Sequence, residues 1–199
     1  MKRVAIMQPY FLPYIGYFQL INAVDEFIIY DNIQFSKKGW FHRNRLLQNG
    51  KDEYFTLPLK KDSDFLDVKE RFLSESWESE KDKILRKIKE NYRKAPFFET
   101  AFPIIEEIFS FKNTNLFEFS FNSLKTLINW LDIKTSIIIS SNLDIDHDAL
   151  RGETKVVALC KVANASHYVN PIGGLELYNR INFENNNLEL SFIKSKSIA

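Results

Sequence analysis

The opening thirty residues constrain the fold more than any other part of the chain. Residues 3–7 form a short apolar run that is typical of a strand buried on both faces, and Gln8-Pro9 ends it. From 14 to 24 the apolar residues recur at a spacing near 3.6, which predicts a helix, and 27–30 is a second apolar run. A strand, a helix and a strand in so short a segment indicate a crossover between two parallel strands. The sequence therefore predicts an α/β fold built on a mostly parallel sheet.

The last third of the chain returns to the same alternation. It contains strand-like runs at 137–139, 167–169 and 188–193, a helical pattern at 153–163 and a helical turn at 175–179. We therefore expect a sheet with flanking helices whose strands come from both ends of the chain.

The middle of the chain has a different character. Asn49-Gly50 separates two strand-like runs, and this dipeptide favours a tight hairpin because both turn positions adopt positive φ. Helical spacing of apolar residues then predicts helices at about 79–94 and 115–131. We expect a single α/β domain over residues 1–199, with an inserted β-hairpin at about 40–59 and a helical insertion at about 79–131.

Composition excludes several classes of protein. The chain is 45% hydrophobic and 27% charged, which is the balance of a folded domain and not of a disordered chain. The net charge of +1 provides no general field for a polyanion, so we expect no nucleic-acid partner. The single Cys excludes an internal disulfide framework, and no apolar stretch reaches the roughly 20 residues of a membrane span. We expect a cytoplasmic protein with no membrane span and no metal site.

Polar residues close several of the apolar runs. Open α/β sheets bind ligands beyond the carboxyl ends of their strands, which makes these residues candidates for a site. Ser140-Ser141-Asn142 closes one of these runs, and the candidates for the site are Gln8, Tyr10, Asp31, Asn170, Gly173 and Gly174. The glycine pair precedes a helical turn and can present backbone N–H groups to an anion. The alternative is that the Asn, Pro and Gly residues here only form turns.

The basic residues between 37 and 61 form the densest polar group, with seven Lys or Arg against two acidic residues. On a strand, Arg43 and Arg45 point to the same face, so their guanidinium groups can clamp one pyrophosphate, with Trp40 near enough to stack on a ring. Asn44 lies between them and joins the candidate substrate-binding residues. The alternative is a hydrated hairpin edge, where Lys and Arg commonly prevent strand pairing.

The other reactive residues favour structural roles. Cys160 ends an apolar helical run, which favours a buried structural thiol over a nucleophile. The acidic stretch at 144–148 lacks the spacing of an EF-hand and is typical of an exposed loop. The chain contains no P-loop, G-x-S-x-G or G-x-G-x-x-G motif, so the residues alone identify no cofactor.

Several longer motifs resemble one known family. They are MQPYFLPYIGY at 7–17, DNIQF at 31–35, KKGW at 37–40, RNR at 43–45, NYRKAP at 91–96 and YVNPIGG at 168–174. These motifs are long, specific and spread over nearly the whole chain. On this basis the sequence resembles the WbqC-like family.

The resemblance implies a bacterial enzyme that makes O-antigen, the polysaccharide of lipopolysaccharide, or another surface polysaccharide. It also implies that glycine or another acyl unit is attached to an amino sugar. We accordingly expect a transferase that acylates or aminoacylates the amine of a nucleotide-linked amino sugar, with an acyl or aminoacyl donor as its other substrate.

Each candidate residue has a role in this interpretation. Arg43 and Arg45 hold the diphosphate, and Asp31 orients or deprotonates the attacking amine. Sugar hydroxyls bind to Gln8, Tyr10 and Asn170. The alternative is a noncatalytic module that binds a sugar nucleotide or the polysaccharide machinery.

Overall fold

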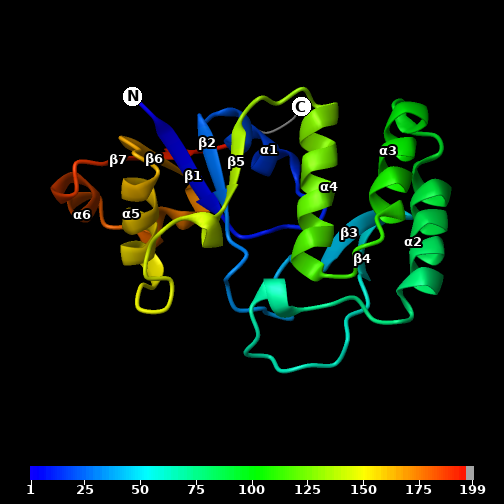
Figure 1. Ribbon diagram of the computed structural model, residues 1–199. Coiled ribbons are helices and arrows are strands. Elements are labelled where there is room, and N and C mark those ends of the chain that lie inside the picture. The colour runs from blue at the N-terminus through cyan, green and yellow to red at the C-terminus, as the bar shows by residue number, and fades with distance from the viewer. Residues whose placement is uncertain (196–199) are drawn as a thin grey trace. The chain divides into compact units, whose positions relative to one another are not determined.

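Five parallel strands form the main sheet of the computed structural model, which describes residues 1–195. The strands are β1 (Arg3–Met7), β2 (Glu26–Ile29), β5 (Ser136–Ile139), β6 (His167–Pro171) and β7 (Glu189–Ile193). Their order is β5-β2-β1-β6-β7, and every neighbouring pair is parallel (Figure 1). The predicted parallel sheet is therefore confirmed.

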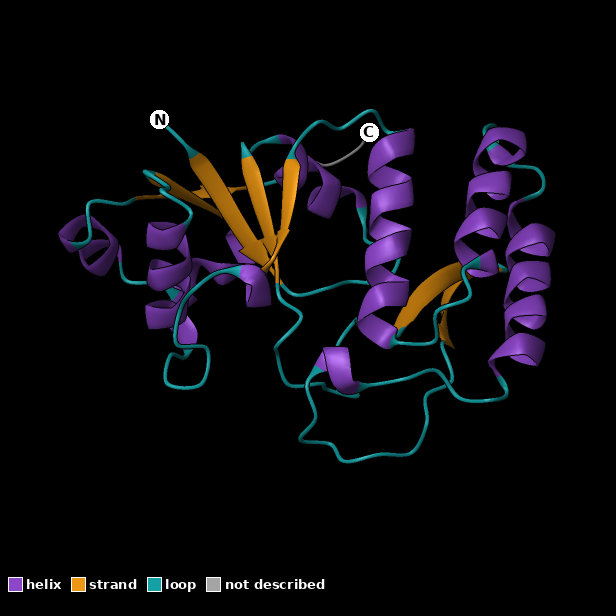
Figure 2. Ribbon diagram, viewed as in Figure 1, coloured by secondary structure: helices purple, strands orange, loops and turns teal. Residues whose placement is uncertain are grey.

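Helices cover both faces of this sheet (Figure 2). Successive side chains of a strand point to opposite faces, so Phe27 and Ile28 of β2 face different layers. The ring of Phe27 packs against that of Tyr17 in α1 (Ile15–Asn22), with 5.3 Å between the ring centroids. Ile28 lies in a buried apolar cluster with residues of α5 (Gly152–Val162). The sheet is therefore doubly wound, and its central strands β1 and β2 are buried on both faces, whereas the edge strands β5 and β7 are only partly buried.

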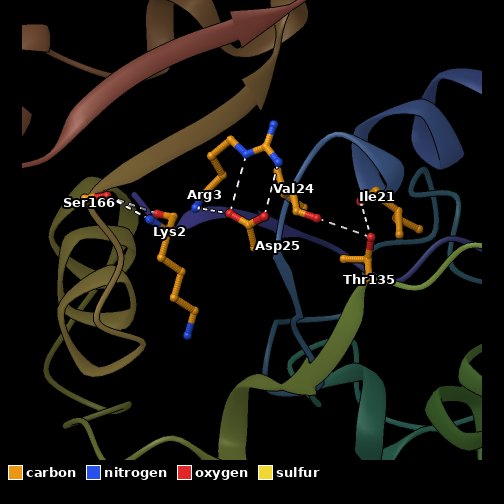
Figure 3. A network of polar contacts seen from close by, with 7 residues as sticks. All are labelled: Lys2, Arg3, Ile21, Val24, Asp25, Thr135 and Ser166. Carbon is orange, nitrogen blue, oxygen red and sulfur yellow. Dashed lines mark hydrogen bonds and ion pairs between the residues drawn. The ribbon is translucent and has the colours of Figure 1, made fainter.

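Polar side chains tie together the amino ends of the strands (Figure 3). Just before β2, the carboxylate of Asp25 accepts a hydrogen bond from the backbone N–H of Arg3 (2.7 Å) and another from its Nη2 (3.1 Å). Just before β6, the hydroxyl of Ser166 accepts a hydrogen bond from the N–H of Lys2 (2.9 Å). Just before β5, the hydroxyl of Thr135 donates to a carbonyl of α1 (2.8 Å). Asp25, Thr135 and Ser166 thus have structural partners at this edge of the sheet.

The chain divides into two compact units. Unit 1 comprises Met1–Gln8, Pro13–Asn32 and the chain from Asp132 on, and it contains the parallel sheet. Unit 2 comprises Pro9–Leu12 and Ile33–Leu131, and it contains the middle of the chain.

The predicted hairpin in unit 2 is confirmed. β3 (Arg43–Gln48) and β4 (Lys51–Thr56) pair antiparallel, and the turn residues Asn49 and Gly50 have φ values of 51° and 76°. These values are the positive φ angles that the Asn-Gly turn requires. β3 begins at Arg43, later than predicted, because a turn precedes it. In that turn the N–H of Gly39 donates a hydrogen bond to the carbonyl of Ser36 (2.9 Å).

Three helices follow the hairpin, α2 (Trp77–Tyr92), α3 (Phe98–Ser110) and α4 (Leu116–Trp130). The predicted helices in the middle of the chain are therefore present. The helical pattern had not singled out α3, which contains Pro103 in its interior. Proline has no N–H for the helical ladder, so it usually indicates a helix boundary. Here the helix continues past Pro103, and its buried side chains Phe98, Phe102, Ile108 and Phe109 lie on both sides of the proline.

Aromatic rings fill the core of unit 2. The ring of Trp77 lies 5.6 Å from that of Phe109 and 5.2 Å from that of Phe119, centroid to centroid. All three side chains are buried. Short helices complete the described chain: η1 (Val68–Glu70), η2 (Ser140–Asn142), η3 (Ile172–Leu177) and α6 (Arg180–Asn185). Across residues 1–195, no helix has the length and apolar character that crossing a membrane requires.

Candidate functional site

The order of the strands marks one point on the carboxyl edge of the sheet. From β1 the chain builds outward through β2 and β5 on one side, and later through β6 and β7 on the other. The strand order therefore reverses between β1 and β6, and the loops after these two strands leave in opposite directions. Doubly wound sheets bind their ligands at such a point. The parallel pairing brings the predicted residues Gln8, Asp31 and Asn170 to this edge, together with Ser140.

Asp31 is buried just after β2, with 4% of its surface exposed. Its Oδ1 accepts hydrogen bonds from the hydroxyl of Ser140 (2.9 Å) and from the backbone N–H of Ser141 (3.0 Å). The same hydroxyl lies 2.7 Å from Oδ1 of Asn32. The start of η2 therefore holds the carboxylate in one orientation, which suits a group that must position a ligand.

Asn170 occupies the corresponding position on β6 and is also buried. Its Oδ1 accepts a hydrogen bond from the hydroxyl of Tyr168 (3.0 Å), and its Nδ2 donates to the carbonyl of Pro171 (3.2 Å). The hydroxyls of Tyr168 and Tyr178 lie 3.2 Å apart. Burial raises the pKa of both tyrosines, so both hydroxyls keep their protons at neutral pH. The network therefore offers uncharged donors and acceptors.

The two predicted glycines differ in their surroundings. Gly174 is buried against Asn170, and a Cβ there would lie 2.0 Å from the Nδ2 of Asn170. Gly173 is exposed, and a Cβ there would meet no atom within 4 Å. The close approach to Asn170 thus explains why position 174 is a glycine, and no contact explains the glycine at position 173. Anion binding by the backbone of η3 stays a prediction.

Gln8 lies where β1 ends. Its backbone carbonyl accepts a hydrogen bond of 2.8 Å from the hydroxyl of the buried Tyr17, which fixes the exit of the strand. Gln8 itself is exposed. Its proposed contact with a sugar hydroxyl stays a prediction.

Lys155 is a buried charge in unit 1 that no sequence motif indicates. It is 8% exposed and lies in the first turn of α5. Its Nζ lies 5.5 Å from the ring centroid of Tyr30 and 3.5 Å from the carbonyl of His147. Tyr30 directly precedes Asp31, so a buried amine lies near the same end of β2. The available sequence signal was a lysine beside the apolar run 156–160.

The remaining predicted residues, Tyr10, Arg43, Asn44 and Arg45, belong to unit 2. All of them except Asn44 lie close to one or both of the rings of Trp40 and Tyr54. We call this group the aromatic–arginine cluster, and its members are Tyr10, Trp40, Arg43, Arg45 and Tyr54. The ring of Trp40 stacks on that of Tyr10 at 5.5 Å and on that of Tyr54 at 5.9 Å. The guanidinium carbons of Arg43 and Arg45 lie 5.4 and 5.2 Å from the Trp40 centroid. Both arginines thus share one face of β3, as strand alternation requires.

Each arginine of the cluster also has a local partner. Arg43 donates to the carbonyl of Gly39 through Nε (3.1 Å) and to that of Lys38 through Nη2. Arg45 forms an exposed ion pair with Asp52, with 2.9 Å between Nη1 and Oδ2. A guanidinium group has five N–H donors, so these contacts use only part of each group.

Asn44 points its amide at the backbone of unit 2. Its Nδ2 donates to the carbonyls of Phe11 (3.0 Å) and Leu12 (2.5 Å). Its Oδ1 accepts a hydrogen bond from the N–H of Arg45 (2.8 Å). These contacts give Asn44 a structural role, and its role in substrate binding stays a prediction.

Cys160 is fully buried in the core of unit 1, which confirms the predicted structural thiol. Burial raises the pKa of this thiol to about 12. At neutral pH the reactive thiolate is therefore nearly absent.

Comparison with known proteins gives the chain a family. The model of the WbqC-like protein family matches residues 8–199. An uncharacterized protein of Mycobacterium tuberculosis is 33% identical over 177 residues, which cover 85% of this chain and 72% of that protein. No solved structure matches the chain. The matched region includes both the polar edge of the sheet and the aromatic–arginine cluster, and the chain belongs to the WbqC-like protein family.

Proposed function

We propose that the protein is a cytoplasmic transferase of bacterial surface-polysaccharide biosynthesis that acylates or aminoacylates the amine of a nucleotide-linked amino sugar. The observation that carries this proposal is the polar carboxyl edge of unit 1. There a buried carboxylate in a fixed orientation, Asp31, shares the edge with the neutral network around Asn170. The function implied by the WbqC-like resemblance supports the same reading.

The reaction places defined demands on this edge. The amine of the sugar attacks the acyl carbonyl, a C–N bond forms, the bond to the donor's leaving group breaks, and the amine loses a proton. Asp31 accepts a hydrogen bond from the amine and orients it, and the carboxylate takes up that proton or passes it to solvent. Ser140 acts as a positioning residue because its hydroxyl holds the Asp31 carboxylate.

The sugar needs uncharged partners for its hydroxyls. Asn170 and Gln8 carry amide groups, which both donate and accept hydrogen bonds. The side chain of Asn170 is held by Tyr168, so little ordering entropy is lost when a hydroxyl binds.

In unit 2, the aromatic–arginine cluster supports a diphosphate clamp. Arg43 and Arg45 bring two guanidinium groups to the same pair of rings, with Arg43 5.2 Å and Arg45 5.9 Å from the Tyr54 centroid. Planar, two-pronged donors suit phosphate oxygens, and partly exposed rings suit a base or sugar. The ion pair of Arg45 with Asp52 is what a hydrated hairpin edge would also show.

The first experiment measures turnover. Purified protein is incubated with UDP-linked amino sugars and candidate acyl or aminoacyl donors, and the N-acylated product is detected by mass spectrometry. Asp31→Asn should lower turnover at least about 100-fold while it keeps the hydrogen bonds from Ser140 and Ser141. Ser140→Ala should lower it less, and the loss should appear in kcat rather than KM. Normal turnover by Asp31→Asn would contradict the proposed role.

The second experiment measures binding. Arg43→Lys and Arg45→Lys keep the charge but lose the two-pronged geometry, so each should weaken nucleotide-sugar binding about tenfold or more in titration calorimetry. Denaturant melts of the same variants should stay within about 0.5 kcal/mol of the original protein. Unchanged affinity and stability would refute the clamp and favour the hydrated hairpin edge, and a joint loss of affinity and stability would identify a structural ion pair instead of a binding site. Tight binding with no turnover for any donor would favour the noncatalytic module.

A further inference from the structure

A second basic site lies in unit 2, at the open end of the β3–β4 hairpin. A pocket of about 440 Å³ lies there, between the end of β4 and the loop that follows it. The side chains that matter for its chemistry are Phe35, His42, Lys60, Lys61 and Arg71. Lys60 and Lys61 belong to the basic stretch at 37–61, whereas no sequence pattern singles out Arg71.

Arg71 is the buried charge of this pocket, with 4% of its surface exposed. Its Nη1 donates to the carbonyl of Ser63 (2.8 Å) and its Nη2 to that of Lys60 (3.2 Å). Its guanidinium carbon lies 4.8 Å from the ring centroid of Phe35. Its Nε is buried and, among residues 1–195, has no hydrogen-bond partner. Two carbonyl groups and the Phe35 ring thus surround the positive charge, and no carboxylate is paired with it among the described residues. Burying a cation without an anionic partner costs free energy of folding.

His42 is the second buried polar side chain, 8% exposed. Its ring lies 5.1 Å from that of Phe35, so Phe35 contacts both His42 and Arg71. The Nδ1 of His42 is buried and has no hydrogen-bond partner within the described chain. Burial, together with the nearby charges of Arg43 and Arg71, lowers the pKa of His42 to about 4. The neutral ring can still donate or accept a hydrogen bond to a ligand.

Two exposed lysines add charge at the rim. Lys60 and Lys61 both line the pocket, and Asp62 is its only acidic lining residue in the described chain. A third lining lysine, Lys37, is paired with Asp64 at 3.0 Å. The pocket is therefore strongly positive in a protein whose net charge is only +1.

We propose that this pocket binds the phosphoryl group of a small phosphorylated molecule. The anion would lie against the guanidinium group of Arg71, beside the His42 ring, and compensate the charge of Arg71, while Lys60 and Lys61 close over it. A volume of about 440 Å³ exceeds what a phosphate alone fills, and the apolar lining residues Leu57 and Leu59 suit the rest of the molecule. The inference is independent of the transferase reaction and of the Arg43–Arg45 clamp.

The test follows the histidines by NMR. The chain has three of them, at 42, 147 and 167, so their imidazole resonances can be resolved, and His42→Gln assigns the one that matters. Inorganic pyrophosphate, glucose 1-phosphate and acetate are titrated separately into the full chain at constant ionic strength. The two phosphoryl compounds should shift His42 in a saturable manner and leave His147 and His167 unchanged. Acetate at the same concentrations should have no effect.

Two double variants, each of which removes two lysine charges, test whether the anion binds at Lys60 and Lys61. Lys60→Gln with Lys61→Gln should weaken pyrophosphate binding at least tenfold in calorimetry. The control, Lys51→Gln with Lys112→Gln, removes the same charge from exposed positions elsewhere in unit 2 and should change binding less than twofold. All four lysines are exposed, so folding should be unaffected. Arg71→Lys should weaken binding as well, and the lysine pair decides the test if that variant does not fold.

Several results would overturn the proposal. Absence of any His42 shift would remove the site, and an equal loss in the control pair would show nonspecific charge attraction. An equal response to acetate would show that the pocket does not select phosphoryl groups. Loss of binding in Arg43→Lys or Arg45→Lys, with Lys60 and Lys61 dispensable, would assign the anion to the aromatic–arginine cluster instead.

Discussion

The backbone of Gly174 lies directly against the side-chain amide of Asn170, so that a Cβ at position 174 would be 2.0 Å from Nδ2. Gly174→Ala must therefore displace Asn170 and break its hydrogen bond with Tyr168. We expect a loss of about 1–3 kcal/mol in the free energy of unfolding, from overpacking and from the broken network. Urea melts followed by circular dichroism measure it.

Gly173→Ala is the matched control for this prediction. A Cβ there meets nothing within 4 Å, so stability should change by less than about 0.5 kcal/mol. If the two alanine variants proved equally stable, Asn170 would have room to move. The close approach would then not require a glycine at position 174.

Asn44 should act on the stability of unit 2. Its amide holds the carbonyls of Phe11 and Leu12, and Leu12 has a positive φ of 50°, which a non-glycine residue adopts at a cost. Asn44→Ala should lower the free energy of unfolding by about 1–2 kcal/mol. Asn44→Asp should cost more, because a carboxylate would face two carbonyl oxygens. Equal melts for both variants and the original protein would show that the two hydrogen bonds contribute nothing.

Cys160 should react slowly while the protein is folded. Its thiol is buried and its pKa is raised to about 12 from 9.0, so the thiolate fraction near pH 8 falls roughly a thousandfold. Iodoacetamide labelling followed by mass spectrometry should be complete in urea and nearly absent in buffer. Rapid labelling of the folded protein, with loss of turnover in Cys160→Ser, would instead indicate a thioester mechanism.

His42 should make stability depend on pH. The pKa of His42 is lowered from 6.5 to about 4 in the folded protein, by burial and by Arg43 and Arg71. Between these pH values the unfolded chain binds a proton that the folded chain does not, so the free energy of unfolding falls as the pH drops from 6.5 to 4. The part due to this group should be roughly 1–2 kcal/mol, since solvent screens the ring in part.

The matched variant for this prediction is His42→Gln, which cannot take up a proton. Urea melts at pH 7, 6 and 5, in buffers without phosphate, should show the difference in stability between the two proteins shrinking as the pH falls. Parallel curves for the two proteins would contradict the lowered pKa.

Local patterns in the sequence were enough for much of the fold. Apolar runs and helical spacing indicated the parallel sheet, because both depend on residues that are neighbours along the chain. The Asn49-Gly50 turn was equally predictable, since the positive φ of its residues is a local property. The position of Asp31 after β2 followed from the end of one apolar run.

Packing over long distances decided the rest. Pro103 concealed α3, because proline usually indicates a helix boundary. The packing of Phe109 in this helix against the rings of Phe11 and Trp77 joins residues that are far apart in the sequence. The basic stretch from 37 to 61 was interpreted as one patch. In the structure Arg43 and Arg45 join the aromatic–arginine cluster, while Lys60 and Lys61 line a different pocket.

Arg71 shows the physical reason most directly. It lies outside the basic stretch, and nothing near it in the sequence indicates a buried cation. It reaches the pocket because hydrogen bonds to the carbonyls of Lys60 and Ser63, and contact with the Phe35 ring, fix its place. Residue periodicity carries information about local conformation, whereas burial of a charge beside residues far along the chain depends on how the segments pack.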